Sequence, residues 1–219
     1  MANPVWTLLL VVAAVVVVYV LWRMSRNKQT ISKDPERDAI KFCQRGIDYY
    51  VAGRFSALPG RSIIVSGNLL HHAIEMLLKG ALCKAQTHSP QQIRWMGHNL
   101  KRAWKAFKSS FPDPRLNALD SAVKDLNKFE ELRYPNTQFS TMVQMMILKR
   151  AHVAQTNVTS TAGLTGTRGP TPKKYAYILE DVDELVKLIF DVGRINPQLF
   201  PMPTPALEML RKDNDHPVL

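Results

Sequence analysis

The segment most able to carry chemistry is residues 71–84, HHAIEMLLKGALCK, an apolar run with one carboxylate, Glu75, inside it. Two histidines, His71 and His72, precede this acid, and Lys79 follows it one helical turn later on the same face. A helix this apolar is expected to be buried. Because a buried carboxylate needs a charged or hydrogen-bonded partner, Glu75 should sit in a polar cluster.

A metal site is the first chemical reading of His71, His72 and Glu75. One helix, however, supplies only two or three ligands. The chain contains no second Glu-x-x-His segment and no HExxH segment that would complete such a site. We therefore expect no metal site and no cofactor.

The sulfur-containing residues read as core residues. Cys43 and Cys83 are the only cysteines and form no CxxC pair, which favours a reducing compartment. Met142, Met145 and Met146 form a stripe typical of core filling, with an interaction groove as the alternative.

Apolar residues at helical spacing predict the elements that position these groups. Residues 34–55 begin with Asp34 as an N-cap and Pro35 at the first helical position. Residues 61–85 are apolar around most of the helix circumference, which predicts a central, buried helix. Residues 97–111 predict a third helix with a basic outer face.

Further helices are predicted downstream, and no segment alternates clearly enough to predict a strand. The fold class is therefore all-α, an up-and-down bundle of five or six helices. The remaining predictions are helices at 113–132, 138–153 and 177–195, a Thr/Gly/Pro-rich loop at 153–176, and a proline-rich tail at 196–219.

The N-terminus predicts a membrane anchor. Residues 5–22 carry no charge and, as a helix, would span about 27 Å, close to the thickness of a bilayer core. The start of the chain lacks a basic region and the segment lacks a cleavage site, so we expect an uncleaved transmembrane helix. The basic linker at 23–34 should remain in the cytoplasm, which places the N-terminus outside and the helical domain inside.

Charge is distributed unevenly along the chain. The whole net charge of +11 arises within residues 23–110, and the remainder is balanced. Such a surface could contact anionic lipid or RNA, although a solvated basic face accounts for it equally well.

Three short motifs occur in order on this helical background: A-x-E-x-x-L-K at Ala73–Lys79, G-H-x-L at Gly97–Leu100, and R-Y-P at Arg133–Pro135. In this the chain resembles the HEPN family (higher eukaryote and prokaryote nucleotide-binding), over about residues 35–195. The resemblance implies a helical bundle, often dimeric, in cytosolic proteins tied to RNA cleavage, nucleotide binding or defence. We accordingly expect a homodimer.

The resemblance also implies that the second and third motifs pack beside the first. This makes Glu75, Lys79, His98, Arg133 and Tyr134 a candidate cluster. It could be a buried ion-pair cluster that fixes helix packing, or a small pocket for the phosphate of a nucleotide or RNA. In the third alternative Glu75 is exposed.

The ribonucleases of the family carry an arginine followed, after four to six residues, by a histidine. Only Arg211 and His216 have this spacing, in the tail, and Arg94 and His98 are one residue short. We therefore expect a non-catalytic module that binds nucleotide, RNA or protein. One alternative is a divergent metal-independent ribonuclease that uses His98 with Arg94 or Arg133. The other is a membrane scaffold that recruits a partner.

Overall fold

The structure, a computed structural model, describes residues 34–57, 62–133, 143–148 and 173–200. All described elements belong to one compact unit that begins at Pro35. Within these residues no helix combines the length and apolarity that crossing a membrane requires. The predicted anchor at residues 5–22 lies outside them.

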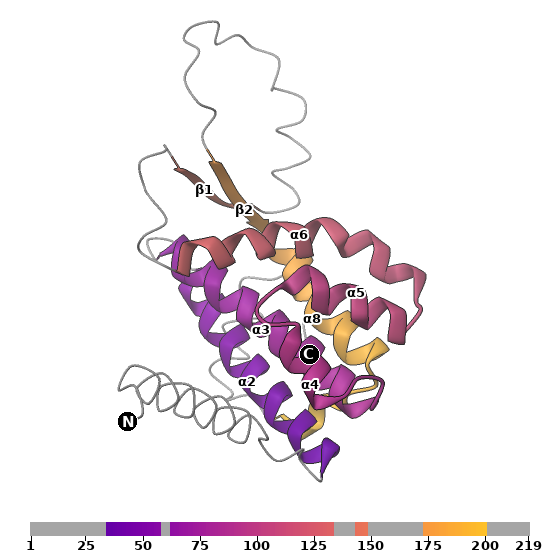
Figure 1. The fold of residues 1–219 in the computed structure, drawn as a ribbon. Helices are drawn as coiled ribbons and strands as arrows, with labels where there is room; N and C mark the ends of the chain where they lie inside the picture. Colours follow the sequence, from indigo (N-terminus) through magenta and orange to yellow (C-terminus); the bar gives the residue numbers. More distant parts are fainter. Residues whose placement is uncertain (1–33, 58–61, 134–142, 149–172, 201–219) are drawn as a thin grey trace, which may run out of the picture. The chain divides into compact units, whose positions relative to one another are not determined.

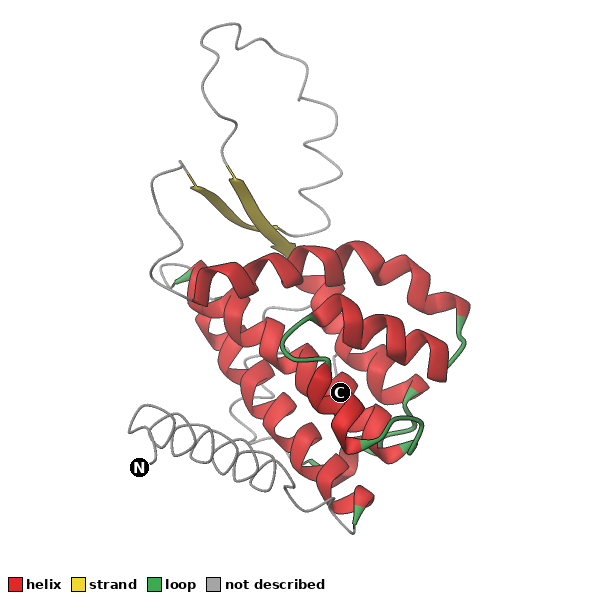
Figure 2. Ribbon diagram, viewed as in Figure 1, coloured by secondary structure: helices red, strands yellow, loops and turns green. Residues whose placement is uncertain are grey.

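The predicted helical bundle is confirmed, and helices make up most of the described residues (Figure 2). The α-helices are α2 (Pro35–Ser56), α3 (Ile63–Lys84), α4 (Pro90–Trp95), α5 (Leu100–Ser110), α6 (Asp120–Lys128) and α8 (Leu179–Val192). Three short 3-10 helices accompany them: η1 (Pro114–Leu119), η2 (Phe129–Arg133) and η3 (Pro197–Leu199).

Helix α3 is the central helix, as its apolar circumference predicts. It packs along α2 and also contacts α4, α5, α6, α8 and η2 (Figure 1). Glycines let α2 and α3 approach closely. A Cβ on Gly46 of α2 would lie 2.7 Å from Leu77 Cγ, and one on Gly80 of α3 would lie 2.5 Å from Cys43 Sγ. Side chains larger than hydrogen at these positions would force the helices apart.

The turn from α3 to α5 contains a helix that periodicity did not predict. Helix α4 is short and begins with a capping box, in which Ser89 and Gln92 each bond the other's backbone N–H. Gly97 follows at a φ of +57°, a conformation that favours glycine. Asn99 then caps α5 by accepting a hydrogen bond from the Arg102 N–H.

The predicted helix at 138–153 is wrong where the structure describes it. Residues Val143–Leu148 form strand β1, which pairs in parallel with β2 (Lys173–Ile178), from Val143 beside Lys173 to Leu148 beside Ile178. Strand β2 also replaces the end of the loop predicted at 153–176. The expected methionine stripe is therefore not helical: Met145 and Met146 lie on β1, and Met142 lies outside the described residues.

The physical reason for β2 is its aromatic alternation. Tyr175 and Tyr177 are both buried, two residues apart, and their rings contact Phe129 with centroid separations of 5.8 and 5.6 Å. Period-two burial suits a strand and not a helix. The strand runs directly into α8, so this last helix begins two residues later than the predicted 177.

Candidate functional site

Glu75 lies in the middle of α3 with its side chain fully buried, and both carboxylate oxygens have partners. Lys79 Nζ donates a hydrogen bond to Oε1 at 2.6 Å. Nδ1 of His98 lies 3.1 Å from Oε2, and Nδ1 of His72 lies 3.3 Å from the same oxygen. Four residues from two parts of the chain thus form one polar group, called here the Glu75 cluster.

The hydrogen bonds determine the ionisation of this carboxyl. Burial raises the pKa of Glu75. Hydrogen bonds from His72, Lys79 and His98, together with the positive charge of Lys79, outweigh this effect and lower the pKa to about 2. The group is therefore a carboxylate at every physiological pH. A buried, permanent negative charge holds the two histidines in fixed orientations.

Side chains of α3 also fix the backbone that carries His98. Lys79 Nζ donates to the carbonyl oxygen of Gly97 at 2.7 Å. The next carbonyl oxygen, that of His98, lies 3.0 Å from Nε2 of His71. Although this backbone is anchored twice, the His98 side chain itself is 51% exposed. The cluster is consequently buried on the Glu75 side and open to solvent on the His98 side.

His71 connects the cluster to α6 and η2. Its ring is fully buried, with Nδ1 3.1 Å from the Leu126 carbonyl oxygen and Nε2 3.3 Å from Oε2 of Glu130. Burial lowers the pKa of His71, and the Leu126 carbonyl, Glu75 and Glu130 offset only part of this effect. The ring acts as a bridge between elements and presents no edge to solvent.

The structure brings together three of the five residues predicted for the cluster: Glu75, Lys79 and His98. Arg133 does not contact Glu75, because it ends η2 and its Nη1 donates to both oxygens of Glu130 at 3.2 Å. Tyr134 lies outside the described residues.

The predicted catalytic pairs do not form among the described residues. Arg94 is exposed on α4, and no hydrogen bond or ion pair joins it to His98. Arg133 pairs with Glu130, as described above. Arg211 and His216 lie outside the described residues. The motifs of the resemblance correctly predict that His98 lies beside Glu75. The arginines suggested as its catalytic partners, Arg94 and Arg133, do not pair with it.

Sequence reasoning missed the role of His72. The three-residue spacing from His72 to Glu75 places both on one face of α3, and this was the available signal. What the sequence did not show was that His98 closes on the same carboxylate oxygen. The rings of His72 and His98 are perpendicular, with centroids 5.7 Å apart, and the ring of Tyr49 lies 5.5 Å from that of His72.

A second feature is an open cavity of about 700 Å³ on α4 and α5, called here the α4–α5 cavity. Its lining residues are His88, Gln92, Trp95, Met96, Arg102, Lys105, Ala106 and Ser109. Trp95 is 82% exposed, and Arg102 Nη1 donates to the Trp95 carbonyl at 2.8 Å. No lining residue is acidic, and between Glu75 and Asp113 the sequence has seven lysines and arginines and no acid.

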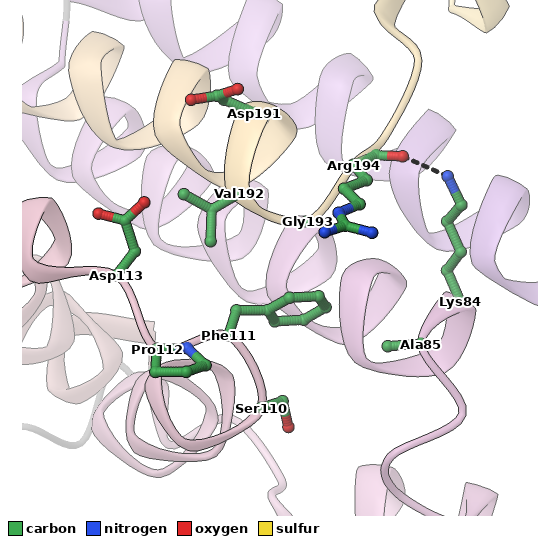
Figure 3. Close-up of a pocket in the computed structure, with 10 residues that line it drawn as sticks. All are labelled: Lys84, Ala85, Ser110, Phe111, Pro112, Asp113, Asp191, Val192, Gly193 and Arg194. Atoms are coloured by element: carbon green, nitrogen blue, oxygen red, sulfur yellow. Dashed lines mark hydrogen bonds between the residues drawn. The ribbon is translucent and has the colours of Figure 1, made fainter.

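The cavity between the ends of α3, α5 and α8 has a different character (Figure 3). It measures about 600 Å³ and is lined by charges of both signs. Lys84 donates to the Arg194 carbonyl. The two acids, Asp113 and Asp191, pair with Arg115 at 2.7 and 2.8 Å. Because the two cations of the lining, Lys84 and Arg194, balance its two carboxylates, this cavity has little excess charge with which to select a ligand.

A second buried charged group joins α2 to α8. Arg54 and Asp183 are 5% and 3% exposed, with Arg54 Nε 3.3 Å from Asp183 Oδ1. Tyr50 donates from its hydroxyl to the same oxygen at 2.5 Å. Nearby, the Tyr177 and Ser66 hydroxyls are hydrogen-bonded, and Ser66 Oγ donates to the Gly53 carbonyl at 2.9 Å. We call Tyr50, Arg54 and Asp183 the Asp183 cluster.

A scan with protein-family models gave no match to this chain, and comparisons with curated proteins and with solved structures gave none either. The resemblance to the HEPN family therefore rests on the three motifs alone.

Proposed function

We propose that this chain is a single-pass membrane-anchored, HEPN-like helical module that binds single-stranded RNA on the cytoplasmic side of the membrane. The α4–α5 cavity is the RNA-binding site. The observation that carries this proposal is Trp95, a large aromatic side chain that is 82% exposed in a cavity whose charged lining residues are all basic.

An exposed tryptophan beside cations matches the chemistry of unpaired nucleotides. Each base has a flat face that stacks on an aromatic ring, which contributes about 1–3 kcal/mol per base, and this stacking tolerates any sequence. The phosphates that link the bases are met by Arg102 and Lys105, on the same cavity wall. Gln92 and Ser109 add hydrogen-bonding groups that can meet a ribose 2′-hydroxyl.

The positive charges of the cavity are available to a ligand. Among the described residues, no carboxylate forms an ion pair with Arg102 or Lys105. By contrast, Lys108, one turn further along α5, pairs with Asp120 at 2.9 Å. Ligand phosphates would therefore meet unneutralised cations at one end of α5 and a neutralised one at the other.

The anchor and the dimer complete the proposal. The uncharged segment at residues 5–22 and the basic linker at 23–34 support a cytoplasmic domain close to the membrane. The HEPN resemblance supports a homodimer, which sedimentation equilibrium of the full-length protein in neutral detergent tests directly.

RNA cleavage is a second candidate function, favoured by one specific contact. The buried carboxylate of Glu75 faces Nδ1 of His98, and no described residue hydrogen-bonds the other nitrogen of this half-exposed ring, which could take a proton from a 2′-hydroxyl. His72, on the same carboxylate oxygen, is the neighbouring acid–base group. The described residues thus offer a second histidine where the sequence suggested Arg94 or Arg133.

The direct test is fluorescence anisotropy with a short labelled poly-uridine RNA and the full-length protein in neutral detergent. Trp95→Ala should weaken binding at least about tenfold, from the lost stacking. The double variant R102Q/K105Q should weaken binding and flatten its salt dependence. Lys187→Gln, on an exposed face of α8, is the matched control and should bind like the wild type.

Two results would overturn the RNA proposal. The first is RNA binding that is unchanged in both cavity variants. The second is loss of binding to anionic vesicles, and not to RNA, in the same variants, which would identify the cavity as a lipid contact. Gel analysis of the same RNA, with His98→Asn beside the wild type, decides whether cleavage accompanies binding.

A further inference from the structure

We infer that His72, Glu75 and His98 form a binding site for a divalent transition-metal ion, and that zinc fits it best. The ligand atoms of these three residues all lie within 4.8 Å of one another. The site is separate from the α4–α5 cavity lining, so this inference goes beyond RNA binding and does not depend on it.

The distances between the ligand atoms suit a common ion. Zinc lies about 2.0–2.2 Å from imidazole nitrogens and carboxylate oxygens, so neighbouring ligand atoms in a tetrahedral site are about 3.3–3.6 Å apart. Oε2 of Glu75 lies 3.1 Å from Nδ1 of His98 and 3.3 Å from Nδ1 of His72. These two separations are close to the required values and the third lies within 4.8 Å, so movement of the histidine side chains would place an ion between the three atoms.

The ligand set selects the kind of metal. Two imidazoles and one carboxylate favour zinc and its neighbours in the first transition series, whereas magnesium and calcium require mainly oxygen ligands. Three protein ligands leave at least one coordination position for water or substrate, which is the arrangement of catalytic and not of structural zinc sites. The half-exposed ring of His98 provides a route by which the ion enters.

The surroundings hold the three ligands in place. Helix α3 carries His72 and Glu75 three residues apart on one face. Lys79 fixes the other oxygen of Glu75 and also the carbonyl of Gly97, directly before His98. Outer contacts of this type orient metal ligands, and their loss weakens metal binding.

Two further charges face the site and act in opposite directions. The ammonium of Lys79, 2.6 Å from Oε1, opposes a cation and lowers affinity. Glu130 lies across His71 from Glu75, with Oε2 3.3 Å from the His71 ring, and adds a negative charge that favours a cation. Of the two carboxylate oxygens of Glu75, Lys79 donates to Oε1. The other oxygen, Oε2, faces the two histidines and can bind the metal.

The test uses the full-length protein in neutral detergent, stripped of metal with a chelator and desalted. Added zinc should bind at one ion per chain and raise Tm by about 5 °C or more once its free concentration exceeds Kd about a hundredfold. Magnesium at the same concentration should not change Tm. Cobalt(II) should give visible absorption bands of a bound ion, which report coordination independently of stability.

The variants His72→Asn and His98→Asn should each abolish the zinc-dependent rise in Tm and the cobalt bands. His88→Asn is the matched histidine control for metal binding, because its partly buried ring lies outside the three-ligand group, and it should respond to zinc like the wild type. Circular dichroism verifies that each variant is folded, which the partial exposure of both ligand histidines favours.

Two outcomes overturn the inference: no zinc-dependent change in the wild type, or an equal change in His72→Asn and His98→Asn. RNA binding by His72→Asn separates the two proposals. That variant should lose zinc and keep wild-type RNA affinity, since His72 does not line the α4–α5 cavity.

Discussion

The protein buries two charged clusters against α3 and its neighbours, and they differ in their access to solvent. In the Asp183 cluster the cation and the anion are both almost fully buried, and a tyrosine hydroxyl completes it. In the Glu75 cluster the anion is fully buried but His98 is half exposed. A closed ion pair can only affect folding, whereas a buried anion that orients exposed histidines can also meet a ligand.

The two clusters also differ in how completely they are satisfied. Both oxygens of Glu75 accept hydrogen bonds of ordinary length. In the closed cluster, Nε and Nη2 of Arg54 have no hydrogen-bond partner among the described residues, although Nε lies within ion-pair distance of Asp183. Arg54 therefore depends strongly on the charge of Asp183, and the sharpest way to test the comparison is to remove that charge.

The largest effect is expected for Asp183→Asn. Breaking a buried ion pair leaves an uncompensated charge on Arg54 and should reduce the free energy of unfolding by about 3–5 kcal/mol, measured by urea denaturation. Asp191→Asn removes an exposed carboxylate of the same helix, which pairs with Arg115, and should cost less than about 1 kcal/mol. Equal costs for the two variants would contradict the view that Asp183 is a closed structural pair.

Acid should act on the open cluster. The pKa of Glu75 falls from 4.5 to about 2 on folding. Its contribution to stability is therefore complete above about pH 4.5 and is lost as the pH falls toward 2. The loss amounts to about 3 kcal/mol, from 1.36 kcal/mol per pKa unit. Urea denaturation of metal-free protein at several pH values should show this dependence, and Glu75→Gln should lack that part of it.

Alkali should act on the closed cluster instead. Burial, the charge of Asp183 and its hydrogen bond raise the pKa of Tyr50 well above 10. The contribution of the neutral hydroxyl is present below about pH 10 and is lost as the pH rises above it. Tyr50→Phe should remove this alkaline component and leave the acid component of Glu75 unchanged. If Glu75→Gln and Tyr50→Phe both altered the acid side, or both the alkaline side, of the stability–pH profile, the two clusters would be coupled and the comparison would fail.

The sequence predicted one of these clusters and not the other, for a physical reason. Glu75 stands out because it interrupts an apolar run, and Lys79 lies one turn away on the same helix. The Asp183 cluster joins residues 129 positions apart, from Arg54 to Asp183, and each looks like an ordinary polar residue of an amphipathic helix. Pairing over such a separation follows from the packing of α2 against α3 and α8, which periodicity does not determine.

The strands were missed for a related reason. Residues 143–148 are apolar enough for either a helix or a strand, and short apolar segments are ambiguous when read alone. What decides the outcome is the partner strand β2, 30 residues later in register, whose two buried tyrosines pack on Phe129. The long helices α2 and α3, by contrast, were predicted to within about two residues because their periodicity extends over six turns.

Gly97→Ala should produce an intermediate effect on the open cluster alone. A φ of +57° disfavours a side chain by about 1–2 kcal/mol, although a Cβ there would meet no atom within 4 Å. The free energy of unfolding should fall by that amount, and zinc affinity should fall with it, because His98 follows directly in the chain. Gly193→Ala is not a matched control, since its Cβ would approach the Ile189 carbonyl. The better control is Asn99→Ala, which removes the N-cap of α5 beside the same turn. It should lower the free energy of unfolding by about 1 kcal/mol without altering the conformation at position 97.

The smallest effect is expected for Arg133→Met, and it tests the R-Y-P motif. Among the described residues Arg133 forms an ion pair only with the partly exposed Glu130, so its loss should cost less than about 1 kcal/mol. Its indirect effect is more informative. Without Arg133, Glu130 keeps its contact with the buried His71 ring, and zinc binding at the Glu75 cluster should strengthen slightly because a nearby cation has been removed. Isothermal titration of metal-stripped Arg133→Met and of a Lys124→Met control on α6 measures this change. A loss of zinc binding in Arg133→Met alone would mean that Arg133 positions the cluster through Glu130 and His71, and the third motif would then belong to the site as fully as the first two.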